Sequence, residues 1–167
     1  MIHEGDPVEP MRDPRAALNH IMEALVFSYR YDLEERTFVL VTEFPLKSPG
    51  SVREFAAFVF ATVDFERLAG DLAPYQRFHE AYSGVGPGGM VVQDVQQRDI
   101  GPDRHRLELW FGDNFGGVAV VYGQLRGFTR GSTAEQVGPR QWVYRDSRTK
   151  ERFDLDFPFP SLVGPAT

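Results

Sequence analysis

Two runs of alternating residues decide the fold, Leu25-Val-Phe-Ser-Tyr-Arg-Tyr31 and Phe38-Val-Leu-Val-Thr-Glu-Phe44. Every second residue of each run falls on one face, and these residues are Leu25, Phe27, Tyr29, Tyr31, Phe38, Leu40, Thr42 and Phe44. β-branched and aromatic residues with a period of two are typical of strands. Because only the short polar stretch Asp32-Leu-Glu-Glu35 and two further residues separate them, the runs predict an antiparallel hairpin. Pro45 ends the second strand, since proline cannot donate to a ladder.

A second hairpin is predicted in the C-terminal half. Residues 104–111 alternate, with Leu107, Leu109 and Phe111 facing inward and Arg106, Glu108 and Trp110 on the opposite face. The stretch Gly112-Asp-Asn-Phe-Gly-Gly117 has the composition of a turn. An apolar strand over 118–122 follows, and we expect it to continue towards Phe128.

Several other segments have strand character. Residues 90–98 and 141–145 are strand candidates, and 153–157 alternates but precedes Pro158 and Pro160, which indicates an edge strand or a strapping tail. Residues 51–63 fit two structures. Ser51 and Glu54 have the spacing of a helical capping box, whereas the run from 58 to 63 is rich in strand formers. We favour a strand there and keep the helix as an alternative.

Two helices are predicted. Asp13-Pro14 is typical of a helix start, with aspartate as N-cap and proline at the first helical position, and the helix would cover about 14–24. Residues 64–82 indicate a turn followed by a helix. The residues that recur there at three- and four-residue spacing are Leu72, Tyr75, Phe78, His79 and Tyr82.

These patterns predict a single α+β domain over 1–167, mostly antiparallel sheet, with an N-terminal helix and one middle helix. A loosely ordered segment is expected at 1–13, a glycine-rich loop at 83–89 and a proline-rich tail at 153–167. The chain of 167 residues is long enough to bury a core without disulfides.

Composition excludes several classes of function. The chain has no cysteine, so it has no disulfide framework, thiolate metal site or cysteine nucleophile. The net charge of −6 argues against a general nucleic-acid binder, which normally carries a basic face. The longest apolar runs are far shorter than the ~20 residues of a membrane helix. We therefore expect a cytoplasmic protein with no membrane or nucleic-acid partner.

Motifs for catalysis or cofactors are not found. The histidines at 3, 20, 79 and 105 lack the short spacing of metal ligands, and there is no Gly-x-Ser-x-Gly elbow. The glycines at 84, 86, 88 and 89 are not followed by the Lys-Ser/Thr end of a phosphate-binding loop. We accordingly predict no catalytic residue, no metal ligand and no cofactor, and no feature indicates an enzyme.

The best candidate site combines carboxylates with a tryptophan. Asp94, Glu108 and Asp113 can meet on one sheet face, and Trp110 shares the face of Glu108. Paired carboxylates perform glycosidic chemistry, and tryptophan stacks on sugar rings. A solvated strand face explains the same residues, and we favour it.

Aromatic residues interleaved with arginine form a second pattern, Tyr29-Arg30-Tyr31. Such stacking platforms bind single-stranded nucleic acid, but the net charge opposes this interpretation. We favour core packing for Tyr29 and Tyr31.

Three stretches carry a family resemblance, Phe27–Leu40 by its strand, turn and strand, the Phe- and Val-rich 58–65, and the late hairpin at 106–118. Together they resemble small bacterial β-rich domains of unknown function, including immunity-type proteins of polymorphic toxin systems. The resemblance covers about half of the chain and implies a β-rich fold with a non-enzymatic binding role.

Two functions are therefore carried forward. The first is a bacterial non-enzymatic binding protein of the immunity type that neutralises a basic protein partner through an acidic surface. The alternative is a small-ligand or carbohydrate-binding domain, with glycosidic activity as an extension, at a cleft near Glu108, Trp110 and Asp113. Docking of the tail at 153–159 on a second copy would make a homo-oligomer.

Overall fold

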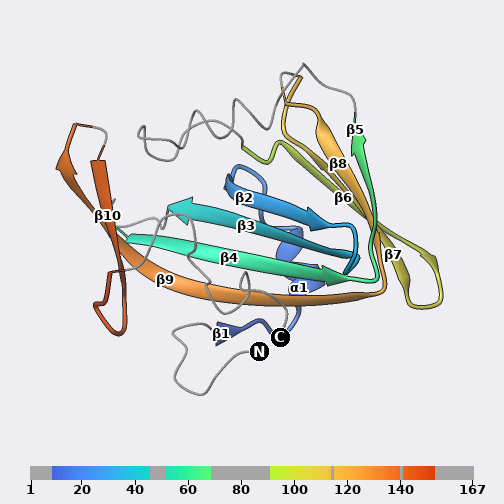
Figure 1. The fold of residues 1–167 in the computed structure, drawn as a ribbon, viewed down its shortest axis with the longest axis horizontal. Helices are drawn as coiled ribbons and strands as arrows, with labels where there is room; N and C mark the ends of the chain where they lie inside the picture. The colour runs from blue at the N-terminus through green and yellow to red at the C-terminus, as the bar shows by residue number, and fades with distance from the viewer. Residues whose placement is uncertain (1–8, 46–51, 69–90, 114, 140, 153–167) are drawn as a thin grey trace.

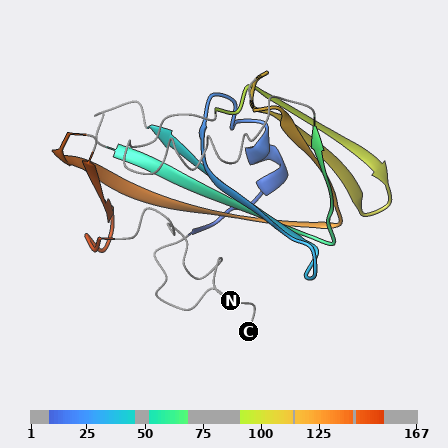
Figure 2. The same ribbon diagram turned by 45° about the horizontal axis from the view of Figure 1, so that its top comes forward.

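The computed structural model describes residues 9–45, 52–68, 91–113, 115–139 and 141–152. They form two antiparallel sheets, with one short helix, α1, in the angle between them (Figures 1 and 2). The β-rich antiparallel class that the alternating patterns predict is confirmed. Two full helices are not found in these ranges.

The large sheet has the strand order β1-β9-β4-β3-β2, with β10 pairing with β9. Its strands are β1 (Glu9–Pro10), β2 (Leu25–Asp32), β3 (Thr37–Pro45), β4 (Val52–Ala61), β9 (Gln124–Gly138) and β10 (Gln141–Asp146). The hairpin of β2 and β3 is confirmed, and Tyr31 pairs with Phe38. The predicted position of Leu25 on the face of Tyr29 and Tyr31 is wrong, because a bulge between Val26 and Ser28 shifts the register and puts Val26 in the core instead. The ambiguous segment at 51–63 is a strand, because β4 pairs with β3 and β9 along its whole length.

The small sheet has the order β5-β8-β7-β6. Its strands are β5 (Asp64–Leu68), β6 (Asp94–Gly101), β7 (Arg104–Trp110) and β8 (Gly117–Tyr122). The second predicted hairpin is confirmed as β7 and β8, and Leu107 and Leu109 face inward as expected. Gly117 opposes Trp110 at one end of this pair, and Tyr122 opposes His105 at the other.

The chain passes between the sheets at one corner, where β4 leads to β5 and β8 leads to β9 (Figures 1 and 2). Asp64 lies at this corner and accepts hydrogen bonds from Arg36 at 3.0 Å and from Arg104 at 2.8 Å. The Arg104 guanidinium also donates to the Thr62 carbonyl at 2.8 Å. One carboxylate therefore links the β2–β3 turn, the corner and the start of β7.

The core lies between the two sheets. The large sheet contributes Phe38, Leu40, Phe58 and Phe60, and the small sheet contributes Leu107, Leu109, Val118, Val120 and Tyr122. The Phe60 and Tyr122 rings meet edge to face with centroids 4.9 Å apart, which is a favoured aromatic geometry. Among the alternating runs, Phe38 is thus explained by packing.

The N-terminal helix begins as predicted and ends early. In α1 (Pro14–Leu18) the Asp13 carboxylate accepts the Ala16 N–H at 3.1 Å, as an N-cap should. The expected extension to residue 24 is wrong, because Glu23 has a positive φ of 69° and its N–H donates to the Val92 carbonyl. Val92 returns a hydrogen bond to the Ala24 carbonyl, so pairing with another segment replaces the helical bonds.

Three other predictions need correction. The turn expected from residue 64 is strand β5, which completes the edge of the small sheet by pairing with β8. The strand expected to run from 118 towards Phe128 leaves the small sheet after Tyr122, and β9 begins at Gln124. Glu9 and Pro10 belong to β1 instead of a loose segment. The helical pattern at 72–82, the loop at 83–89 and the tail at 153–167 lie outside the described residues.

Only the start of β9 was predicted, as a continuation of the strand at 118–122, because most of its 15 residues are polar or glycine, including two internal glycines. A tertiary contact explains the glycine at position 127, since a Cβ there would overlap the Met11 sulfur and lie 2.9 Å from the Pro14 Cβ. Glycine in a strand often marks such a close approach. Within the described ranges, no helix has the length and apolar character needed to cross a membrane.

Candidate functional site

The outer face of the small sheet carries most of the predicted site residues. Strand register places four residues in each cross-strand row, and paired residues point to the same face. The rows are Leu68, Gly117, Trp110 and Asp94, then Glu66, Ala119, Glu108 and Gln96, then Asp64, Val121, Arg106 and Arg98. The central strand β8 thus presents small or aliphatic residues between polar neighbours.

Trp110 is positioned by the glycine beside it. A Cβ at Gly117 would lie 3.0 Å from the Trp110 ring and would overlap the Leu109 carbonyl oxygen. The missing side chain therefore allows the indole to lie over β8. The Trp110 side chain keeps part of its surface in solvent, which leaves an aromatic surface available on the face.

A hollow of about 190 Å³ lies beside the indole. Its lining residues are Leu68, Asp94, Gln96, Glu108, Leu109 and Trp110. The structure therefore brings three of the four predicted site residues together. Asp113 is exposed in the turn after β7 and is not among the residues that line the hollow. The turn carries it past the end of the β7–β8 ladder.

Hydrogen bonds orient the two carboxylates of the hollow. Arg106 donates to Glu108 through Nε at 3.1 Å and through Nη2 at 2.8 Å, and both bonds end on Oε1. Gln96 donates to Asp94 at 3.0 Å. The Oε2 atom of Glu108 takes no part in its pair with Arg106, and Glu66 adds an exposed carboxylate in the same row as Glu108. The hollow combines an aromatic surface with acceptors.

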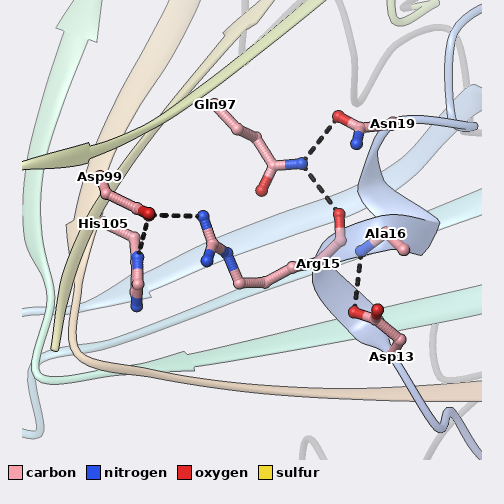
Figure 3. A network of polar contacts seen from close by, with 7 residues as sticks. All are labelled: Asp13, Arg15, Ala16, Asn19, Gln97, Asp99 and His105. Atoms are coloured by element: carbon pink, nitrogen blue, oxygen red, sulfur yellow. Dashed lines mark hydrogen bonds and ion pairs between the residues drawn. The ribbon is translucent and has the colours of Figure 1, made fainter.

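A second polar cluster joins α1 to the small sheet (Figure 3). The Asp99 carboxylate lies between the Arg15 guanidinium at 2.7 Å and the His105 Nδ1 at 2.6 Å. The Gln97 amide donates to the Arg15 carbonyl at 2.9 Å and to the Asn19 side chain at 2.8 Å (Figure 3). Gln97 and Asp99 of β6 therefore hold the helix, and His105 of β7 holds Asp99.

Electrostatics in this cluster follow from its contacts. Two hydrogen bonds, first the one with His105 and then the one from Arg15, lower the pKa of Asp99 below its ordinary value. Burial raises the pKa of Tyr122, whose ring lies 5.4 Å from that of His105 between centroids. Histidine spacing did not reveal this cluster, because Arg15 and Asp99 are 84 positions apart. The contacts account for the docking of α1.

No group of three or more histidine or acidic residues in the part of the chain that the structure describes could hold a metal ion. Comparison of the chain with protein-family models, with curated proteins and with solved structures finds no match. The function therefore has to be argued from the geometry of the site.

Proposed function

We propose that this chain is a non-enzymatic binding protein that uses the outer face of its small sheet to bind a basic segment of a partner protein. The observation that supports it most directly is Trp110 beside Asp94 and Glu108 on an exposed sheet face. An aromatic face attracts a lysine or arginine side chain, and adjacent carboxylates pair with the same cation.

Charge on the face supports a basic partner. The three rows contain the acids Asp64, Glu66, Asp94 and Glu108 against the bases Arg98 and Arg106. Asp64 is engaged by Arg36 and Arg104, and Glu108 by Arg106. The other two acids, Glu66 and Asp94, take no part in these ion pairs. Both lie in the two rows nearest Trp110. Complementary potential of this kind steers association.

The resemblance to immunity-type proteins extends the proposal to a bacterial protein that neutralises its basic partner in the cytoplasm. Neutralisation needs only that binding covers the partner's own working surface. This role requires no chemical step and no cofactor. It also suits a face where a rigid ladder positions the aromatic anchor, because anchors of this type dominate binding energy in protein interfaces.

The test uses a fluorescein-labelled deca-lysine peptide and a deca-glutamate peptide of the same length, with binding followed by anisotropy. We expect the basic peptide alone to bind, and Trp110→Ala to weaken it about tenfold, the loss of roughly 1.4 kcal/mol. Asp94→Asn should weaken it less. The matched control is Glu35→Gln, an equal loss of charge on the β2–β3 turn, outside the small sheet. Equal binding by Trp110→Ala and Glu35→Gln would remove Trp110 from the proposal.

A carbohydrate ligand is the second candidate, favoured by the hollow itself. Trp110 offers a stacking surface, and Asp94, Gln96 and Glu108 offer hydrogen-bonding groups around it. Titration with cellotriose and chitotriose, followed by the Trp110 indole N–H resonance, tests it. Saturable shifts in the wild type that disappear in Glu108→Gln would favour the sugar over the basic peptide. Glycosidic activity would require a further demonstration of bond cleavage.

A further inference from the structure

The edges of the two sheets enclose a second hollow that the proposed function does not use. It has a volume of about 210 Å³ and is lined by Tyr29, Arg30, Tyr31, Phe65 and Arg67. Three of these residues belong to β2, the edge strand of the large sheet, and two belong to β5, the edge strand of the small sheet. The β2–β3 turn and the start of β5 lie at the same end of the molecule (Figures 1 and 2).

Aromatic rings form the apolar part of this hollow. The Tyr31 and Phe65 rings are stacked, with centroids 4.7 Å apart and planes 15° from parallel. Tyr29 stacks on Phe111 in the same way at 6.1 Å. Both tyrosines and Phe65 are only partly buried, although they lie on the inner faces of their sheets. Aromatic surface therefore reaches the opening between the sheets without being covered by the opposite sheet.

One arginine adds positive charge to the same opening. Arg67 is exposed and lies on the inner face of β5, where it pairs with Val118, whereas Arg30 pairs with Val39 and belongs to the outer face of the large sheet. Arg67 neighbours Glu66 in sequence, but alternation along β5 puts Glu66 on the outer face of the small sheet. The opening thus carries a guanidinium group next to flat apolar surface.

We infer that this hollow binds a small ligand with a planar apolar ring and one carboxylate. The ring would lie against the stacked pair of Tyr31 and Phe65, since aromatic groups favour offset stacking. The carboxylate would accept hydrogen bonds from Arg67. Guanidinium suits this anion because its planar fork matches the two carboxylate oxygens. The site is separate from the outer face of the small sheet, and its ligand has the opposite charge to the proposed basic partner.

The experiment uses 2-naphthoate as the probe and neutral 2-naphthamide as the matched probe, with calorimetry for affinity and amide NMR shifts for position. We expect 2-naphthoate to bind with a dissociation constant on the order of 1 mM or below, and the amide at least about tenfold more weakly. Shifts should concentrate at residues 29–31 and 65–67. Equal binding of the two probes, or absence of binding, would overturn the inference.

Variants locate the charge. Arg67→Gln should weaken 2-naphthoate by about tenfold, since a charge-assisted hydrogen bond is lost, and should leave the weak binding of 2-naphthamide unchanged. The control is Arg98→Gln, which removes an exposed arginine from β6, the opposite edge of the same sheet. It should leave both probes unaffected. Unchanged naphthoate binding by Arg67→Gln would contradict the inference, and thermal melting of both variants verifies that they fold.

Discussion

The outer faces of the two sheets differ in what they expose. On the large sheet the outer face contains Val41, Ala57, Phe128 and Phe55, which are all at most 3 % exposed. On the small sheet the corresponding face has a partly exposed tryptophan among carboxylates and arginines. A sheet that buries residues on both faces contributes mainly to stability, whereas an open polar face is free to bind. Stability and recognition are therefore separable by substitution.

Two arginine–aspartate contacts, one in each sheet region, show the same contrast between a buried and an exposed site. Arg130 of β9 and Asp146 of β10 belong to the large sheet; their side chains are 6 % and 1 % exposed, and their N–O distance is 2.9 Å. Arg15 and Asp99 form a similar contact at 2.7 Å, but their side chains are 40 % and 66 % exposed. Burial, and not contact distance, should set the effect of breaking each pair.

The largest effect is expected for Asp146→Ala. It removes the partner of a buried guanidinium and two hydrogen bonds to the Arg148 and Thr149 backbone N–H groups at 2.8 and 2.9 Å. We expect the free energy of unfolding to fall by about 3–5 kcal/mol, as for other broken buried pairs. Urea unfolding measures it, and Asp99→Ala at the exposed pair is the matched control. Similar losses for the two variants would contradict the importance of burial.

A smaller loss is expected for Gly117→Ala on the small sheet. The added Cβ would collide with the Leu109 carbonyl and displace the Trp110 ring, which costs about 1–3 kcal/mol in overpacked sites. Gly131→Ala is the control, because its Cβ would meet the Ser147 side chain no closer than 3.3 Å. NMR should show the Trp110 indole resonance shifted only by the first variant. An unshifted indole resonance would argue against contact between the ring and this glycine.

Trp110→Ala should affect stability less than either change, by about 1 kcal/mol or less, because the side chain is partly exposed. The loss of binding free energy for the basic peptide should exceed this loss in the free energy of unfolding. Urea unfolding and anisotropy on the same protein sample compare the two. A loss of stability as large as that of Asp146→Ala would place Trp110 in the core instead of the binding face.

The smallest of these effects on the free energy of unfolding is expected from protonation of Asp99 in acid. The pKa of Asp99 is lowered in the folded state from 3.8, first by the hydrogen bond with His105, so its contribution is present above that pH. It is lost as the pH falls through the lowered pKa. Unfolding at about pH 6 and about pH 2 should therefore show less acid destabilisation in Asp99→Asn than in the wild type. Identical losses would indicate that the contact contributes nothing in solution.

Asp146 should follow the same sign for a different reason. Burial alone would raise its pKa, but hydrogen bonds from the Thr149 backbone, the Arg130 guanidinium and the Arg148 backbone together lower it. Its stabilising charge is thus also lost as the pH falls. Comparing Asp146→Asn with Asp99→Asn over the same pH range would show whether the buried carboxylate accounts for the greater part of acid unfolding.

Local pattern alone predicted the hairpins of β2 with β3 and β7 with β8, the strand β4, the N-cap at Asp13 and the shared face of Glu108 and Trp110. Each depends on alternation or on contacts between residues close in sequence, so a short window contains the necessary information. The core positions Phe38, Phe58 and Leu107 followed from the same alternation.

Tertiary structure decided the rest. The early end of α1 depends on Val92, strand β5 on pairing with β8, and β9 on partners that compensate for its polar composition. The contact of Arg15 with Asp99 and His105, and the hollow between β2 and β5, join residues distant in the chain. Hydrogen-bond partners and burial at such positions depend on sheet order, and sheet order is set by the packing of the whole chain.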